Sequence, residues 1–212
     1  MEIIKHSHRW ELNLPEPSAI QTGPAIIAVH GRGSDPDAFL NLPRRLGWME
    51  LPIMEPLAEG RSWYPQGFKA PLSDNQPGIA NALEAVDNAR QGLHALGFQD
   101  HQIILIGFSQ GACVAVHYAL MNPTRYKGVF ALTGGYIGPD GEDWGFEGDL
   151  QRTPVMITTS EEDQWVPLRR VEETEAELKR LNAHVHKIIY KDRPHAVSDD
   201  EIQRIREMMP IV

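Results

Sequence analysis

Short runs of consecutive apolar residues alternate along the chain with stretches in which apolar residues recur every three or four positions. The apolar runs are residues 25–29, 102–108, 126–132, 154–159 and 185–190. Because successive side chains of a strand point to opposite faces, a run without polar positions indicates a strand that is covered on both faces. Two weaker runs, residues 11–14 and 51–54, are expected to supply edge strands.

Four stretches between these runs have the periodicity of helices. They are residues 79–96, 112–120, 168–181 and 199–208. The first has an apolar stripe and is followed by Gly97, a residue typical of a helix C-terminus. The second is apolar on nearly every side, so we expect it to be buried against the sheet. Ser198 or Asp199 is the expected cap of the last helix.

The alternation of strands and helices predicts an α/β fold with a doubly wound parallel sheet. No repeat, low-complexity tract or Ser/Gly linker divides the 212 residues, so residues 1–212 are expected to form a single domain. Two irregular stretches, residues 59–77 and 134–152, are long for loops in a compact domain, and such loops are usually functional or disordered. Their aromatic residues favour ordered loops that pack against the core.

The composition restricts the classes of partner. A net charge of −9 without a compensating basic stripe argues against nucleic acid as a partner and against stable residence on an anionic membrane. The longest apolar run is too short to span a bilayer, and residues 1–6 are too polar for a signal peptide. Cys113 is the single cysteine, so no intrachain disulfide can form. A cytoplasmic enzyme that acts on a small molecule is the expectation.

The strongest candidate for chemistry is Gly107-Phe108-Ser109-Gln110-Gly111. A predicted strand ends at this G-x-S-x-G pattern and a predicted helix begins directly after it, as in the nucleophile elbow of serine hydrolases. A side chain at position 107 or 111 would collide with the neighbouring strand or helix. The N-terminus of the helix favours an oxyanion beside Ser109, with the N–H of Gln110 pointing at it. The alternative is an ordinary strand–helix turn with a structural serine.

A serine nucleophile needs a base, and the base needs an orienting acid; in this fold the three occur in the order serine, acid, histidine. His195 lies between the last predicted strand and the last predicted helix, where the base must come from. His184 and His186 also follow Ser109. They flank the start of an apolar run, so we expect them to be strand-end residues on one face.

Asp163 is the predicted acid, because it follows the next-to-last predicted strand and can meet a histidine that follows the last one. Glu161, Glu162 and Asp192 remain alternatives on position alone. For the second oxyanion donor, the loop His30-Gly31-Arg32-Gly33 follows the first buried strand, and the N–H of Arg32 would face the substrate. A glycine-rich turn without this role is the alternative.

Taken in order, these stretches resemble the phospholipase/carboxylesterase family of α/β-hydrolases, which includes acyl-protein thioesterases and small bacterial carboxylesterases. The resemblance covers nearly the whole chain and rests on His30-Gly31-Arg32-Gly33, Ser62-Trp63-Tyr64-Pro65, the elbow, Asp163 with Val166-Pro167, and His195. It implies a mostly parallel sheet of about seven strands with helices on both faces and a minimal cap. It also implies a triad of Ser109, Asp163 and His195, with the N–H groups of Arg32 and Gln110 as the oxyanion hole.

The resemblance further implies that Trp63 and Tyr64 line an acyl pocket; the alternative is that they only pin their loop. Trp165 is a candidate for the rim of the site, as is Trp144. The chain departs from the family pattern in two places. Arg193-Pro194 precedes His195 where relatives often have glycine. The His-Gly-x-Gly stretch is followed by Ser34-Asp35, whereas in thioesterases the aspartate commonly follows it directly.

The leading hypothesis is a serine hydrolase without a cofactor that cleaves carboxylic esters of small to medium size through an acyl-enzyme. No metal is expected, because no third ligand accompanies the alternating histidines at 6 and 8 or at 184 and 186. An acyl thioesterase or lysophospholipase for long acyl chains is the alternative within enzymes. A non-catalytic ligand-binding module with the same fold is the alternative from another class. A homodimer is a further candidate assembly.

Overall fold

A seven-stranded sheet forms the centre of the computed structural model, which describes residues 9–13, 23–34 and 41–211. The strands are β1 (Arg9–Asn13), β2 (Ala25–Val29), β3 (Ile53–Leu57), β4 (Ile103–Phe108), β5 (Gly128–Leu132), β6 (Pro154–Ser160) and β7 (His184–Tyr190). Their order is β1-β3-β2-β4-β5-β6-β7; β1 is antiparallel to β3, and the other six strands are parallel. The predicted, mostly parallel sheet is confirmed.

All five apolar runs form strands, with bounds that differ from the prediction by at most two residues. The first weak run overlaps β1, which is an edge strand, although Leu14 lies outside the described residues. The second weak run was wrongly expected at an edge: it overlaps β3, which lies between β1 and β2. β3 is an inner strand because β1 pairs along its outer side.

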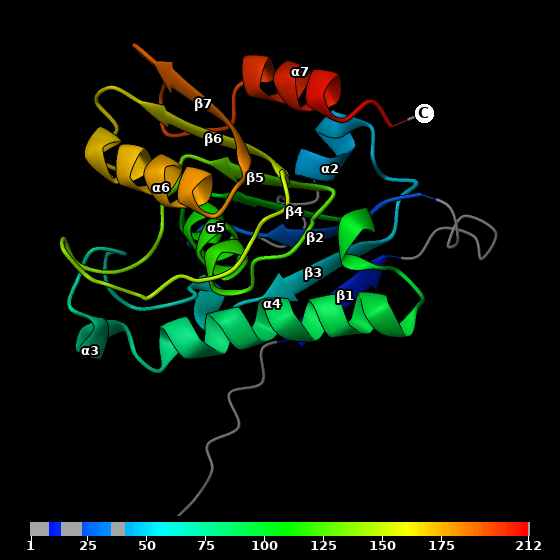
Figure 1. Ribbon diagram of the computed structural model, residues 1–212, viewed down its shortest axis with the longest axis horizontal. Coiled ribbons are helices and arrows are strands. Elements are labelled where there is room, and N and C mark those ends of the chain that lie inside the picture. The colour runs from blue at the N-terminus through cyan, green and yellow to red at the C-terminus, as the bar shows by residue number, and fades with distance from the viewer. Residues whose placement is uncertain (1–8, 14–22, 35–40, 212) are drawn as a thin grey trace, which may run out of the picture.

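Helices cover both faces of the sheet (Figure 1). On one face lie α4 (Gly78–Ala95), α5 (Gln110–Met121) and α6 (Leu168–Arg180), and on the other lie α2 (Asn41–Leu46) and α7 (Asp199–Met208). Successive residues of β2 enter opposite cores: Ile27 packs on the side of the three long helices, and Ile26 packs on the side of α2 and α7. This alternation explains why β2 has no polar position.

The four predicted helices are present. Ser198 is the cap of α7, since its hydroxyl accepts a hydrogen bond from the Glu201 N–H, and Gly97 follows α4 with a φ of +94°. In α5 every one of residues 110–120 is buried, as expected for a helix that is apolar all round. The periodicity did not reveal α2 or α3 (Leu72–Asn75), which have 6 and 4 residues. Helices this short are too brief to show an apolar stripe.

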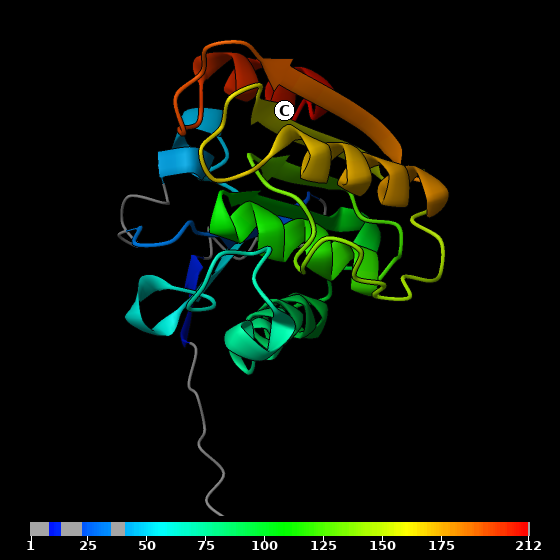
Figure 2. The same ribbon diagram turned by 90° about the vertical axis from the view of Figure 1, so that its left-hand side faces the viewer.

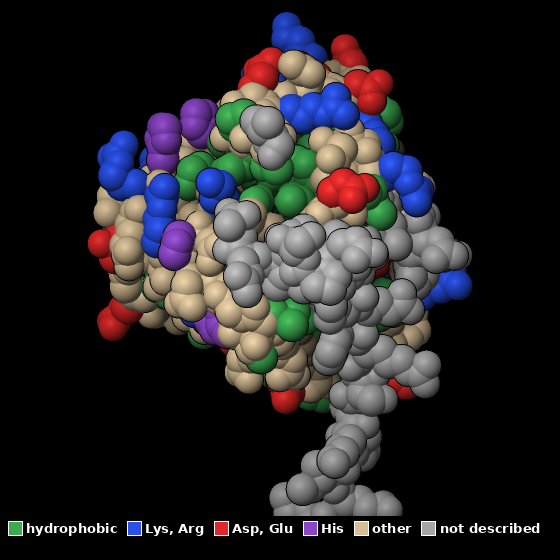
Figure 3. All heavy atoms as spheres, turned by 90° about the vertical axis from the view of Figure 1, so that its right-hand side faces the viewer, with side chains coloured by type: hydrophobic (Ala, Val, Ile, Leu, Met, Phe, Trp, Pro, Cys, Tyr) green, Lys and Arg blue, Asp and Glu red, His purple; other side chains and the backbone are tan. Residues whose placement is uncertain are grey.

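The loops that follow the parallel strands gather at one end of the molecule. The six parallel strands run toward the left of Figure 1, so Figure 2 looks onto their carboxyl ends. Figure 3 shows the opposite end, where basic and acidic side chains are interspersed around an apolar area.

In the part of the chain that the structure describes, none of the helices has the length and apolar character needed to cross a bilayer.

Both long loops pack onto the fold through Arg170 of α6, whose side chain is fully buried. Its guanidinium donates hydrogen bonds to the carbonyl oxygens of Tyr136 and Gly138 at 2.9 and 2.7 Å. Its Cζ also lies 4.4 Å from the centroid of the Tyr136 ring and 5.7 Å from that of Phe68. The Gly138 N–H in turn donates to the Phe68 oxygen at 2.8 Å. One buried cation therefore joins residues 134–152 to residues 59–77.

We predict that Arg170→Met lowers the free energy of unfolding by roughly 2–4 kcal/mol, because it leaves buried carbonyl groups without their donor. Arg169→Met is the matched control. Arg169 is the adjacent residue on α6, and its side chain is 75% exposed and paired with Glu173. An exposed pair of this kind contributes at most about 1 kcal/mol. Urea denaturation of both variants measures the difference, and equal losses would contradict the role assigned to Arg170.

Candidate active site

Ser109 is the single residue between the end of β4 and the start of α5. Its φ of 54° and ψ of −121° lie in a region that residues with a side chain rarely adopt. Two backbone hydrogen bonds hold this conformation: the Ser109 N–H donates to the Leu132 oxygen at 2.9 Å, and the Cys113 N–H donates to the Ser109 oxygen at 3.0 Å. The turn therefore presents the Ser109 hydroxyl at the carboxyl end of the sheet.

The two glycines of the elbow are required sterically, as predicted. A Cβ atom at Gly107 would lie 2.3 Å from the Gly111 oxygen, at the start of α5. A Cβ atom at Gly111 would lie 2.0 Å from the Val29 oxygen and 2.4 Å from the His30 oxygen. The second pair of distances also shows that the elbow lies directly against the loop that follows β2.

The structure brings Ser109, His195 and Asp163 together in one chain of hydrogen bonds. His195 Nε2 lies 2.7 Å from Ser109 Oγ, and His195 Nδ1 lies 2.9 Å from Asp163 Oδ2. Since an ionised carboxylate can only accept, Nδ1 carries the proton and Nε2 is left to accept the hydrogen of the Ser109 hydroxyl. The His195 ring also packs against Phe108, with 5.1 Å between the ring centroids.

Asp163 is held as an anion although its side chain is 1% exposed. Burial pushes the pKa of its carboxyl upward, but hydrogen bonds from His195 and from the backbone N–H groups of Val166 and Trp165 outweigh burial, and the net pKa is lowered. Both N–H groups donate to Oδ1 at 2.9 Å, so the two carboxylate oxygens have separate partners. An anion in this place fixes the orientation of the His195 ring and stabilises its charged form.

The alternative acids and bases of the sequence do not enter this chain of hydrogen bonds. Glu161, Glu162 and Asp192 are exposed. His184 and His186 lie at the start of β7 with their ring centroids 4.6 Å apart, as expected for alternate residues on one face of a strand. His6 and His8 lie outside the described residues. Nowhere in residues 9–13, 23–34 and 41–211 do three His, Cys, Asp or Glu side chains form a group that could hold a metal ion.

Gln110 and Arg32, the predicted oxyanion donors, both line the cavity over Ser109. Gln110 is the first residue of α5, so its N–H has no partner within the helix. The side chains have a bracing role that the sequence did not reveal. Gln110 Oε1 accepts from the Trp63 N–H at 3.0 Å, and the Arg32 guanidinium donates to the oxygens of Tyr64 and Pro65 at 2.9 and 2.7 Å.

The cavity over Ser109 has a volume of about 330 Å³. Of the predicted pocket residues, Tyr64 and Trp165 line it, and Trp165 is 67% exposed at its rim. Trp63 does not line it: the side chain is 1% exposed and its indole N–H donates to the His30 oxygen at 2.8 Å. The expectation for Trp63 is therefore corrected, and this residue pins its loop. The sequence reasoning missed other lining residues, which are Gln66, Gly67, Phe68, Cys113 and Val166.

Cys113 was expected to be a core residue, and it is fully buried. It also forms part of the cavity wall. Burial raises the pKa of its thiol to about 11, so the group is neutral at physiological pH and does not compete with Ser109 as a nucleophile.

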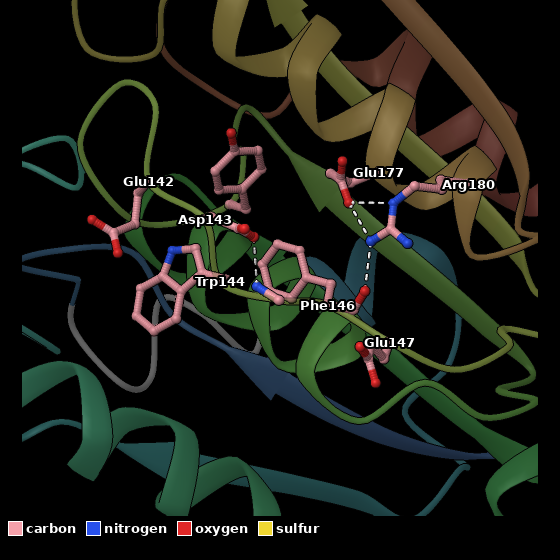
Figure 4. A pocket seen from close by; sticks show the side chains of 9 residues that line it. Glu142, Asp143, Trp144, Phe146, Glu147, Glu177 and Arg180 are labelled. Carbon is pink, nitrogen blue, oxygen red and sulfur yellow. Dashed lines mark hydrogen bonds and ion pairs between the residues drawn. The ribbon is translucent and has the colours of Figure 1, made fainter.

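A second cavity, of about 310 Å³, lies between residues 134–152 and α6 (Figure 4). Its walls carry aromatic and acidic side chains, and Arg180 crosses it to donate to Glu177 at 2.7 Å and to the Phe146 oxygen at 2.5 Å. Neither the serine nor the histidine of the first cavity lines this one. The nucleophile, the base with its acid, and the N–H donors belong to the cavity over Ser109, so this cavity is the candidate active site.

Comparisons with known proteins identify the family of the chain. A family described as Phospholipase/Carboxylesterase matches residues 16–212. A solved phospholipase/carboxylesterase from Dyadobacter fermentans is 36% identical, with a TM-score of 0.90 over 97% of each chain. Carboxylesterases from Bacillus cereus (16% identity, TM-score 0.75, over 96% of this chain and 93% of the other) and Mesorhizobium loti (17%, 0.73, over 93% and 92%) share the fold. None of the curated proteins compared with the chain matches it.

We predict that Asp163 stabilises the folded protein at neutral pH, since its folded-state pKa lies below the value for an unfolded aspartate. This contribution is fully present above about pH 4 and is lost as the pH falls through the lower, folded-state pKa. Asp163→Asn should therefore be less stable than the parent at neutral pH, with the gap narrowing toward about pH 3. Urea denaturation across this range measures the gap. Asp192→Asn, which changes an exposed carboxylate nearby, is the control, and a gap independent of pH would contradict the prediction.

Proposed function

The chain belongs to the phospholipase/carboxylesterase family and is a carboxylic ester hydrolase, and we propose that it cleaves esters of small to medium size through an acyl-enzyme on Ser109. The observation that carries the proposal is the continuous path from Ser109 Oγ through His195 to Asp163, with contacts of 2.7 and 2.9 Å. A hydroxyl with a base at this distance and an oriented acid behind it is the arrangement that acyl transfer requires.

In the first step of the proposed reaction, Ser109 Oγ attacks the ester carbonyl while His195 Nε2 takes the hydroxyl proton. The carbonyl oxygen becomes an oxyanion, and the N–H groups of Gln110 and Arg32 donate to it. As the intermediate collapses, His195 returns the proton to the departing alkoxide, and the acyl group stays on Ser109. Water then attacks this ester with His195 again as the base, which releases the acid and restores the hydroxyl.

The size of the cavity supports the proposed substrate range. A volume of about 330 Å³ suits a short or medium acyl group, and the side chains of Phe68, Val166 and Trp165 offer it an apolar surface. The fully buried Cys113 lies on the wall of this space. Trp165, which is 67% exposed, extends this apolar lining to the protein surface, where a longer acyl chain could bind. An acyl thioesterase or lysophospholipase for long chains is therefore the second candidate.

We predict that Ser109→Ala lowers kcat/KM by roughly 10⁶-fold, as in other enzymes that lose a triad nucleophile. The parent protein should react with a fluorophosphonate probe at Ser109 and should release a burst of nitrophenol from a short nitrophenyl ester. Ser73→Ala, which changes an exposed serine of α3, is the control and should leave both signals intact. A folded parent protein that the probe does not label would indicate a non-catalytic ligand-binding module instead.

A panel of nitrophenyl esters and thioesters with increasing acyl length separates the two enzymatic candidates. We expect kcat/KM to be highest for short and medium acyl groups and to fall once the chain exceeds the cavity. A maximum at long acyl chains, or with thioesters, would favour the second candidate. A cytoplasmic location and a homodimer stay predictions beside this proposal.

A further inference from the structure

The loop that carries His195 has little backbone structure of its own. Residues 191–198, all of which the structure describes, form neither helix nor strand, and they follow β7, the half-exposed last strand of the sheet. One backbone–backbone hydrogen bond within the loop, from the Ala196 N–H to the Pro194 oxygen at 2.7 Å, closes a tight turn around His195. Proton transfer at Ser109 depends on the placement of this imidazole, so the loop needs support from elsewhere.

Ser160 Oγ donates to the Arg193 oxygen at 3.1 Å and Arg45 donates to the Val197 oxygen at 3.0 Å, and the Arg193 side chain holds the part of the loop next to His195. This side chain is 5% exposed, and one guanidinium nitrogen donates to the Ala196 oxygen at 2.6 Å and to Glu201 Oε2 at 3.1 Å. The other terminal nitrogen donates to Thr133 Oγ1 at 2.5 Å. The guanidinium thus connects the residue directly after His195 to α7 and to the end of β5.

These contacts form a closed ring of hydrogen bonds. The ring reaches the segments next to each of the three triad residues. Thr133 follows Leu132, whose oxygen holds the Ser109 N–H, and it has a φ of 58°, which is rare for a β-branched residue. Its own N–H donates to Thr158 Oγ1 at 3.0 Å on β6, the strand that precedes Asp163. Thr158 Oγ1 then donates to Glu201 Oε1 at 2.5 Å, which returns the ring to Arg193.

Glu201 is the countercharge of the ring, and its side chain is fully buried. It is the third residue of α7, where the helix N-terminus favours an anion, and its Oε2 also accepts from the Ser198 N–H at 2.7 Å. Two opposite charges that are both removed from water depend on each other, because either one alone would be buried without compensation. This dependence holds the guanidinium under the loop.

We propose that Arg193, through its buried ion pair with Glu201, is a positioning residue that sets the place of His195 for proton transfer from Ser109. The inference rests on the proposed role of His195 as the base. Arg193 does not touch the reacting atoms. Its guanidinium holds the carbonyl of Ala196, the residue after His195, and links it to the hydroxyl of Thr133. Thr133 is the neighbour of Leu132, which binds the Ser109 N–H.

The test separates positioning from stability by removing the charge of Arg193 alone and then the charges of Arg193 and Glu201 together. Arg193→Met leaves the buried Glu201 carboxylate without its countercharge, so both the stability and kcat should fall. Arg193→Met combined with Glu201→Gln removes both charges and keeps the cap of α7, since glutamine serves in a capping box as well as glutamate does. The double variant should recover stability, while kcat for a short nitrophenyl ester stays down by about 10²-fold with KM changed less than threefold.

Arg204→Met, which removes an exposed arginine of α7, is the matched control and should leave kcat unchanged. Recovery of kcat together with stability in the double variant would show that the pair is merely structural, and a loss confined to KM would also overturn the proposal.

If neither Met variant folds, Arg193→Lys decides by the same criteria, because one ammonium group cannot bridge Ala196 and Thr133 as the guanidinium does. Ser109→Ala is run in parallel: its retained activity would refute the proposed function itself, whereas an inactive Ser109→Ala beside full kcat in the Arg193 variants would refute the positioning role alone.

Discussion

The site depends on how closely α5 approaches β2 at Gly111. A side chain at this position would lie 2.0 Å from the Val29 oxygen, so the absence of one lets the helix begin against the carboxyl end of β2. The same contact places the elbow beside the loop that starts at His30. The N–H groups of Gln110 and Arg32, far apart along the chain, therefore line one cavity with Ser109 between them. The left-handed φ of Ser109 is a consequence of this tight turn.

Around the elbow, side chains rather than backbone ladders fix the loops that complete the site. Arg170 binds the two long loops, Arg193 lies under the loop of His195, and Gln110 and Arg32 brace residues 62–66. Buried or braced guanidinium groups suit this purpose, because one planar cation presents five donors to several carbonyl oxygens at once. The same chemistry thus allows irregular segments to hold catalytic groups in place.

Much of the site could be predicted because its chemistry is ordered along the chain. Ser109 was recognisable from the strand before it and the helix after it, and position singled out His195 as the base. Position alone left Glu161, Glu162 and Asp192 beside Asp163 as acids, and the hydrogen bond from His195 to Asp163 distinguishes them. The pocket was less predictable. Trp63 and Tyr64 are neighbours in the sequence, yet only Tyr64 lines the cavity, while the indole of Trp63 turns inward to His30.

The parallel strands and the four long helices could be read from the sequence, because burial on one or two faces imposes a period that is visible residue by residue. The elbow could also be read, from a G-x-S-x-G pattern between a strand and a helix. Tertiary contacts were needed to show that β3 lies inside the sheet, that Cys113 borders the cavity, and that Arg193 and Glu201 form a ring with two threonines. These outcomes depend on distances between residues remote in the chain, which no local pattern encodes.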